Sequence, residues 1–465
     1  MFTYSMENRG KTSLYEYLYQ CIRNEILSGT LPEGTKLPSR RALAEHLQVS
    51  VVTVENAYRQ LEAEGYVSVY PRRGAFVALP GEIQCDLNLR ADPLLIQPCR
   101  TLETPKNNPA PAHAPSNPSR FPAATWARLT RQILSQESLT VPTPNQGLLS
   151  LRQAIASSLR EYKGMNVSPE QIVVGSGAEY LYLLLAQLLG RSAVFALEDP
   201  GYPKIRMVYQ SCGAVCLSLP LDPQGIDMDA LYFSDATVAH LSPAHHYPTG
   251  IVTTIGRRYA LLQWAETTGA YLIEDDYDSD FRFSGRPIPT LQSIDRAGRV
   301  IYVHTFSQTI SSAMRMGYMV LPPELLGRFQ EKLGFYACTL PVLEQQVLAR
   351  FLSEGYYGKH LSRLRKEYRT RRAALLDILH QGPLRGRAAV LGQEAGLHFL
   401  LRLDTSLTDR DLQARADARG LRLRFLSELA ILPNPAHDHT LIVNDLEYNL
   451  DTFQEAAAVL AEILV

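Results

Sequence analysis

Five short motifs beyond residue 170 combine acidic, aromatic, hydroxyl and basic side chains close to the ends of apolar runs. In chain order they are VGSGAE (174–179), EDPGYP (198–203), LSPAHHYPTG (241–250), YLIEDDYD (271–278) and VHTFSQ (303–308), the last followed by Arg315. The first motif follows a strand pattern and opens a helix, whose free N–H groups and dipole attract an anion. The later motifs present an aromatic ring after one strand, and two carboxylates with a tyrosine at the end of another.

Lysine, the side chain that forms covalent adducts with carbonyl compounds, is scarce in this chain. The chain has 46 basic residues. The lysines among them are Lys11, Lys36, Lys106, Lys163, Lys204, Lys332, Lys359 and Lys366. None lies between Lys204 and Lys332, the stretch that holds most of the five motifs. This gap limits the chemistry that the motifs can perform.

A second group of residues suited to chemical recognition lies in the first eighty residues. Small hydroxyl residues open a helical pattern at residue 50, and arginine pairs stand at 40–41 and 72–73. Such a helix N-terminus fits the major groove of DNA, and the arginines would meet phosphates or, at 72–73, the minor groove. The DNA-contacting residues that we expect are Arg40, Arg41, Ser50, Thr53, Arg72, Arg73 and Gly74.

The residues around these positions predict the elements that present them. Apolar residues recur at helical spacing over 14–27, and Ser39 and Ser50 each stand where they would cap a further helix. Apolar and aromatic runs at 66–70 and 75–77 flank a turn and predict a β-hairpin. A helix, a helix-turn-helix and a β-wing in this order predict a winged helix-turn-helix DNA-binding domain over residues 1–80.

The composition changes after the first eighty residues. Residues 81–118 are rich in proline and polar residues, which is typical of a linker. From residue 119 to 465 helical patterns alternate with short β-branched runs, at 172–174, 193–196, 238–241, 271–273, 300–303 and 317–320. This alternation predicts an α/β domain with a mainly parallel sheet.

The overall composition excludes several protein classes. A net charge of −1 over 465 residues is wrong for a polybasic coat protein or a polyacidic tail, although a local basic patch can still bind DNA. The six cysteines lack paired spacing, so we expect neither a disulfide framework nor a metal site. The polar start and the lack of a long apolar stretch predict a cytoplasmic protein without a membrane segment.

The first eighty residues resemble a known family. LPSRRALAEHL (37–47), VSVVTV (49–54), AYRQLEAEGYV (57–67) and RRG (72–74) are similar to the N-terminal domain of the GntR family of bacterial regulators, and the likeness covers residues 12–78. Val51 and Val52 depart from the polar or basic residues that many members carry there. They favour apolar contact with thymine methyl groups, so the family's operator sequences do not transfer.

The five motifs resemble the pyridoxal 5′-phosphate (PLP) site of fold-type-I aminotransferases. Together with the N-terminal domain, they resemble the MocR subfamily of GntR regulators over most of 119–450. The resemblance implies an α/β fold: a winged helix-turn-helix plus an aminotransferase-like body with a mainly parallel sheet and a smaller C-terminal α+β subdomain. We expect a large part at about 140–325 and a small part at about 326–465. It also implies a homodimer, so that two reader domains engage two half-sites of a double-stranded operator.

The resemblance also implies roles for individual residues. Asp275 would hold the protonated pyridine nitrogen, Tyr277 would donate to the phenolic oxygen, and Tyr202 would cover the ring face. The phosphate would meet arginine, hydroxyls and helix N–H groups. The residues implied for the phosphate are Gly177, Ala178, Thr305, Ser307 and Arg315.

One departure from the family governs the expected function. Gln308 stands where the family has its Schiff-base lysine, and an amide can neither form an aldimine nor act as the base of transamination. The arginine that usually holds the substrate carboxylate is also displaced, because no lysine or arginine follows Arg424. We assign recognition of an anionic effector group to Lys204 and to Arg424, with Arg422 as the alternative to the latter.

These departures favour binding without chemistry. The leading hypothesis is a DNA-binding transcription regulator, not an enzyme, whose body binds a small-molecule effector noncovalently: PLP, pyridoxamine phosphate, or a preformed external aldimine of PLP with an amino acid. The first alternative is a PLP-dependent, aminotransferase-like enzyme, whose lysine a substitution at 308 would have removed. The second is a regulator whose pocket no longer binds a B6 vitamer.

Overall fold

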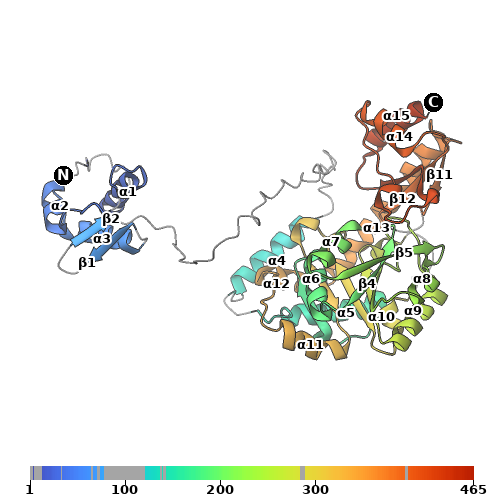
Figure 1. Cartoon of the computed structure of the whole chain (residues 1–465), viewed down its shortest axis with the longest axis horizontal. Coiled ribbons are helices and arrows are strands. Elements are labelled where there is room, and N and C mark those ends of the chain that lie inside the picture. Colours follow the sequence, from blue (N-terminus) through green and yellow to red (C-terminus); the bar gives the residue numbers. More distant parts are fainter. Residues whose placement is uncertain are drawn as a thin grey trace, which may run out of the picture. The chain divides into compact units, whose positions relative to one another are not determined.

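A computed structural model describes most of the chain. The described residues are 4, 13–32, 34–63, 66–70, 74–77, 121–136, 139, 143–282, 289–392 and 396–464. The chain divides into two compact units, Met1–Thr104 and Pro105–Val465 (Figure 1). The expected linker at 81–118, the wing-tip residues Arg72 and Arg73 and the boundary near residue 80 lie outside the described residues.

The first unit is a winged helix-turn-helix. Its elements are α1 (Leu14–Leu27), α2 (Arg40–Leu47), α3 (Val51–Ala63), β1 (Val67–Tyr70) and β2 (Gly74–Val77). The Ser39 hydroxyl caps α2 by accepting the N–H of Ala42 at 3.2 Å, and Ser50 caps α3 through Thr53 at 3.1 Å. Gln48 turns the chain between α2 and α3 in a left-handed conformation. The two strands pair antiparallel, with Tyr70 opposite Gly74 at the turn.

The second unit is built on an eight-stranded sheet in the order β3-β10-β9-β8-β7-β4-β5-β6. Strands β5, β4, β7, β8 and β9 run parallel, whereas β10 is antiparallel to both of its neighbours. The strands are β3 (Ile172–Gly175), β4 (Val194–Asp199), β5 (Val215–Asp222), β6 (Gly225–Ile226), β7 (Val238–Leu241), β8 (Tyr271–Asp276), β9 (Val300–Thr305) and β10 (Gly317–Val320). The predicted mainly parallel sheet is confirmed. The sequence pattern did not predict β5, which is half-buried and contains Pro220.

Helices cover both faces of this sheet because alternate strand residues point to opposite sides. Val174 packs with one group of helices and Val173 with the other. The first group is α4 (Ala123–Gln136), α5 (Leu149–Lys163) and α12 (Val342–Ser353). The second is α6 (Ala178–Leu189), α7 (Pro203–Ser211) and α11 (Pro323–Leu333). Short helices α8 (Met228–Tyr232) and α10 (Leu291–Ile294), with α9 (Ile255–Thr268), complete the layers.

A smaller sheet forms the C-terminal part of this unit (Figure 1). Helix α13 (Tyr356–Gln381) leads into three antiparallel strands with two helices packed on them. The elements are β11 (Ala388–Leu391), β12 (His398–Leu403), α14 (Asp409–Asp417), β13 (Thr440–Asn444) and α15 (Leu450–Ile463). Helix α11, which spans the boundary expected near residue 326, and helix α12, which follows it, still pack against the eight-stranded sheet.

The helices of the described residues do not include a membrane-spanning segment. None of them combines the length and the apolar composition that crossing a bilayer requires.

Candidate functional site

A cavity of about 580 Å³ lies where the parallel strands end. Strands β4, β7, β8 and β9 all finish at one edge of the sheet, which is where ligands bind in open α/β folds. The structure brings nine of the sequence-predicted residues to this one cavity. They are Ala178, Tyr202, Lys204, Asp275, Tyr277, Thr305, Ser307, Gln308 and Arg315. Arg424 of the small C-terminal part joins them, whereas Arg422 is an exposed residue outside the lining.

Asp275 is the buried carboxylate of the cavity. It stands near the end of β8 and is 6 % exposed. The Tyr182 hydroxyl donates to its Oδ2 at 2.6 Å, and His240 Nε2 lies 3.4 Å from the same atom. Burial and the nearby Asp275 raise the pKa of Tyr182 well above its ordinary value, so this phenol remains a donor. The two partners hold Asp275 in one orientation toward the cavity.

Two aromatic side chains from different loops line the cavity beside Asp275. Tyr277 follows β8, and burial with Asp278 and Asp275 nearby raises its pKa well above the ordinary value. Its hydroxyl is therefore protonated at neutral pH and can donate a hydrogen bond. Tyr202 caps the start of α7, is 40 % exposed, and meets the Tyr247 ring edge-on at 6.0 Å.

An anion cup lies at the start of α6. Gly177 caps the helix with φ at +88°, and a side chain there would place its first carbon 2.7 Å from Arg315 Nη2. The bare glycine thus lets the guanidinium sit directly against the helix terminus, whose N–H groups favour negative charge. Arg315 itself has a left-handed backbone. Thr305, the last residue of β9, and Ser307, which follows the strand, add hydroxyls to the same cavity.

A carboxylate of the chain itself already contacts this cup. Glu179 pairs with Arg315, and its other oxygen lies 3.6 Å from Lys204 Nζ. Burial raises the pKa of Glu179, but its hydrogen bond and ion pair with Arg315 outweigh burial, and the pKa is lowered overall. Glu179 is therefore ionised at neutral pH. A phosphate entering the cup would have to replace it as the partner of Arg315.

No described lysine offers an unpaired amine in the cavity that Gln308 lines. Lys204 lines the cavity but is drawn to Glu179. Lys163 lies behind the sheet, where its Nζ is 3.1 Å from carboxylate oxygens of both Asp276 and Asp280. No other described lysine lines the cavity. Gln308 thus lines the cavity with an amide, which cannot attach a carbonyl compound covalently as an amine can.

A buried acid–imidazole pair lies deeper in the same cavity. Glu198 accepts the N–H of Ser242 at 2.8 Å, and its Oε2 lies 3.5 Å from His246 Nε2. Burial raises the pKa of Glu198 from 4.5 to about 8 and lowers the pKa of His246 from 6.5 to about 3. Both groups are consequently neutral at pH 7. The two side chains therefore line the cavity as neutral polar groups and not as an ion pair.

The residues expected to contact DNA that the structure describes stand at the start of α2, at the start of α3 and at Gly74 of β2. Val51 and Val52 are 43 % and 63 % exposed, so the apolar contacts expected of them are accessible. Ser50 and Thr53 are joined by a 2.8 Å hydrogen bond between their hydroxyls. Arg41 is exposed, whereas Arg40 reaches Glu55 at 3.3 Å and is partly neutralised within the unit. Of the two arginines, Arg41 is thus the more accessible to a phosphate.

Sequence reasoning missed the residues that support the site. Tyr182 and His240 sit inside apolar runs, where single polar residues give no signal of a partner far along the chain. Glu179 was part of the first motif, but its pairing with Arg315 spans 136 positions and depends on the fold. The adjacent carboxylates at 275 and 276 were visible, and strand alternation could have shown that they face opposite sides of the sheet.

Comparisons with known proteins agree with this architecture. Residues 14–77 match the GntR family of bacterial regulatory proteins, and residues 114–433 match aminotransferase class I and II. A relative in Bacillus subtilis, the HTH-type transcriptional regulator YhdI, is 36 % identical over 435 residues, which cover 92 % of each chain. The chain belongs to this family of HTH-type regulators with an aminotransferase body.

Two other HTH-type regulators are similar to this chain over most of its length. The probable rhizopine catabolism regulatory protein MocR of Rhizobium meliloti is 33 % identical over 89 % of this chain and 86 % of its own. The pyridoxine biosynthesis regulator PdxR of Corynebacterium glutamicum is 34 % identical over 87 % and 88 %. A solved kynurenine aminotransferase of Pyrococcus horikoshii matches the fold with a TM-score of 0.66 at 24 % identity, covering 75 % of this regulator and 88 % of that chain.

Replacing Glu198 tests the neutral pair in this regulator. A carboxyl with a pKa of about 8 when folded and 4.5 when unfolded binds its proton more tightly in the folded state. The contribution of Glu198 to stability therefore falls as pH rises from about 5 to 8, and Glu198→Gln removes this loss. Thermal unfolding should give similar midpoints at pH 5 and a higher midpoint for the variant at pH 8. A constant difference across this range would contradict the pKa assignment.

Replacing Glu179 tests competition for Arg315. Glu179→Gln removes the internal carboxylate, so PLP should bind about two- to fivefold more tightly, as expected for a partly exposed ion pair. Equilibrium titration followed by absorbance measures the change. Glu324→Gln is the matched control, because Glu324 also pairs with an arginine but lies outside the cavity lining. An equal gain in both variants would contradict the competition.

Proposed function

We propose that this protein is a transcription regulator whose aminotransferase-like body binds PLP, or an adduct of PLP with an amino acid, as a noncovalent effector. The observation that carries the proposal is the composition of one cavity. It retains the groups suited to the phosphate and the ring, and it has Gln308 where covalent attachment would need lysine.

The donor set of the cavity fits this ligand. Gly177 leaves room for Arg315 at the start of α6, and the resulting cup suits a phosphate dianion. Asp275, oriented by Tyr182 and His240, can hold a proton at a pyridine nitrogen. Tyr277 can donate to the phenolic oxygen. Tyr202 supplies an aromatic surface for the ring.

Bound PLP supplies an electron-withdrawing ring and an aldehyde, and the residues of this chain restrict the reactions open to them. Asp275 keeps the ring nitrogen protonated, and Tyr202 shields one ring face from water. Gln308 can donate or accept a hydrogen bond but cannot attack the aldehyde or move a proton between carbon atoms. The site therefore favours recognition over turnover, and we infer a protein without enzymatic activity.

An effector must discriminate between two states of the regulator to control it. Lys204 and Arg424 reach the cavity from α7 and from the small C-terminal part, and each is already engaged with a carboxylate. A ligand with its own carboxylate would replace these partners and draw the two parts together. In a homodimer, such a change would alter how two reader domains meet two half-sites of DNA.

Restoring the lysine tests whether the rest of the cavity is intact. Gln308→Lys should yield a protein to which PLP becomes permanently attached after borohydride reduces the lysine–PLP C=N bond to a secondary amine, whereas wild type should bind PLP and release it on dialysis. Mass spectrometry after reduction measures the incorporation, and Gln308→Arg is the control that adds charge without a reactive amine. Covalent incorporation in wild type would favour the alternative of a PLP enzyme. No binding by either protein would contradict the assignment of the cavity.

Replacing Arg41 tests the DNA face. Arg41→Ala should weaken binding to a fragment selected from genomic DNA, and should reduce the slope of log affinity against log salt by about 1 for each bound reader domain. Gel shifts at several salt concentrations measure both. Arg131→Ala, an exposed arginine of the second unit, is the control and should leave the slope unchanged. Equal slopes for all three proteins would contradict the predicted phosphate contact.

A further inference from the structure

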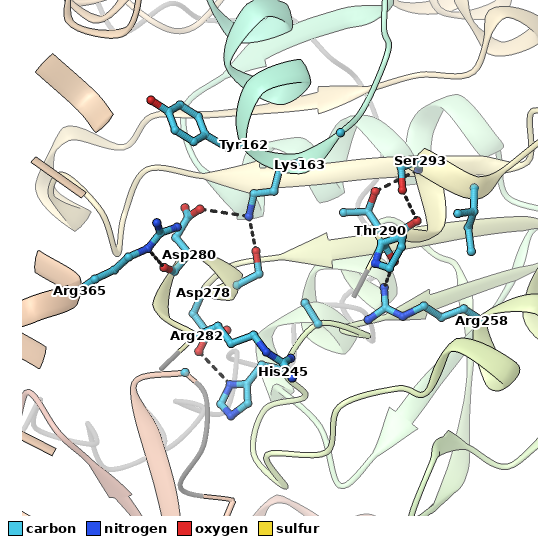
Figure 2. A pocket seen from close by; sticks show the side chains of 16 residues that line it. Tyr162, Lys163, His245, Arg258, Asp278, Asp280, Arg282, Thr290, Ser293 and Arg365 are labelled. Carbon is cyan, nitrogen blue, oxygen red and sulfur yellow. Dashed lines mark hydrogen bonds and ion pairs between the residues drawn. The ribbon is translucent and has the colours of Figure 1, made fainter. Parts of the chain in front are cut away.

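A buried histidine–aspartate pair lies behind Tyr277 and has no role in the proposed function. His245 follows β7 and Asp278 follows β8, and each is 2 % exposed. His245 Nδ1 lies 2.9 Å from Asp278 Oδ2 and 3.2 Å from the Tyr277 hydroxyl oxygen. Figure 2 shows the His245 ring pointing at Asp278 in a second cavity, which His245 and Asp278 line and Tyr277 does not.

The hydrogen-bond partners determine which nitrogen of His245 carries the proton. Asp278 Oδ2 is an acceptor that also receives the N–H of Leu397 at 3.3 Å, so the facing Nδ1 is the donor. His245 Nε2 is buried, and no group in the described part of the chain bonds to it. A bare nitrogen costs less there than an N–H without an acceptor. Nδ1 of His245 therefore carries a proton.

This protonation state constrains Tyr277. The N–H at Nδ1 faces the Tyr277 oxygen as well as Asp278, so that oxygen accepts on the His245 side. Asp278 could also accept the Tyr277 hydroxyl proton, but its Oδ2 already faces the N–H groups of His245 and Leu397. Because Tyr277 lines the ligand cavity, a proton kept from Asp278 in this way is available to a ligand there.

The small C-terminal part packs closely against the His245–Asp278 pair. Gly396 has φ at +69°, and a side chain there would put its first carbon 2.0 Å from His245 Cε1 and 2.6 Å from Asp278 Oδ2. The His398 ring lies 4.6 Å from the His245 ring. Only a glycine fits against the pair, so the imidazole has little freedom to rotate.

The second cavity is less suited to an anion than its basic lining suggests. Lys163 bonds to Asp280 and Ser279, Arg365 donates to the Asp280 carbonyl, and Arg258 donates to the Pro289 carbonyl (Figure 2). These cations already have protein partners. His245 links this second cavity to the ligand cavity, because it lines the former and contacts Tyr277, which lines the latter.

We infer that His245, held by Asp278 and Gly396, is a positioning residue that aims the Tyr277 hydroxyl proton at the 3-oxygen of a bound pyridoxal derivative. The inference rests on the proposed function, because it concerns how the same cavity selects its ligand. Selection would favour ligands whose 3-oxygen is anionic, since an anionic oxygen accepts a stronger hydrogen bond.

The test compares PLP with its 3-deoxy analogue, which lacks the oxygen that Tyr277 would meet. His245→Leu should weaken PLP binding about tenfold and leave binding of the analogue unchanged. His245→Asn places an amide N–H near the position of Nδ1 and should recover most of the loss. In a Tyr277→Phe background, His245→Leu should cause no further loss. Equilibrium titration gives the affinities, and the absorbance of bound PLP should shift toward the protonated 3-hydroxyl form in His245→Leu.

Three results would overturn the inference in distinguishable ways. An equal loss for PLP and the analogue would show that His245 only supports the fold, while the proposed ligand remains. Failure of the wild type to bind either ligand would remove the proposed function, and the inference with it. His245, Asp278 and His398 also have potential ligand atoms within 4.8 Å of one another. Removal of PLP affinity from wild type by a chelator would therefore assign the cluster to a metal ion instead.

Discussion

The end of strand β8 is held by a buried charge pair on which the rest of the ligand cavity depends. Asp275 and Asp276 point to opposite faces of the sheet because side chains alternate along a strand. Asp276 accepts from Lys163 at 3.1 Å and from the Tyr302 hydroxyl at 2.6 Å. Burial alone would raise the pKa of Asp276, but Lys163 and His304 hold it well below its ordinary value. The strand end is therefore fixed from behind, and Asp275 and Tyr277 face the cavity from a rigid support.

The support on the cavity side is equally specific. Tyr182 and His240 orient Asp275, and His245 with Asp278 stands behind Tyr277. Breaking a buried charge pair such as Lys163–Asp276 leaves an uncompensated charge and costs about 3–5 kcal/mol of folding stability. The charged residues behind β8 therefore stabilise the fold as well as the site. The cavity thus combines these rigidly held groups with Gln308, and we propose that this amide stands where an aminotransferase has its reactive amine. A cavity of this composition would recognise a ligand and leave it chemically unchanged.

Much of this arrangement could be predicted from the sequence. The strand runs, the helix caps at Ser39 and Ser50 and the edge shared by the five motifs follow local rules of pattern and capping, and the structure confirms the elements. The pairing of Glu179 with Arg315, the position of Lys163 behind β8 and the approach of Gly396 to His245 could not be predicted. Each joins residues far apart in the chain and depends on how the elements of the second unit pack on one another.

The central claim is that one cavity binds a pyridoxal phosphate ligand without a covalent bond. A crystal structure of the protein soaked with PLP tests it most directly. We expect the phosphate against Arg315 and Ser307 with Glu179 displaced, the pyridine nitrogen at Asp275, and no covalent bond to the chain. A phosphate bound elsewhere, or a cavity in which Glu179 still pairs with Arg315 and no ligand is present, would contradict the account.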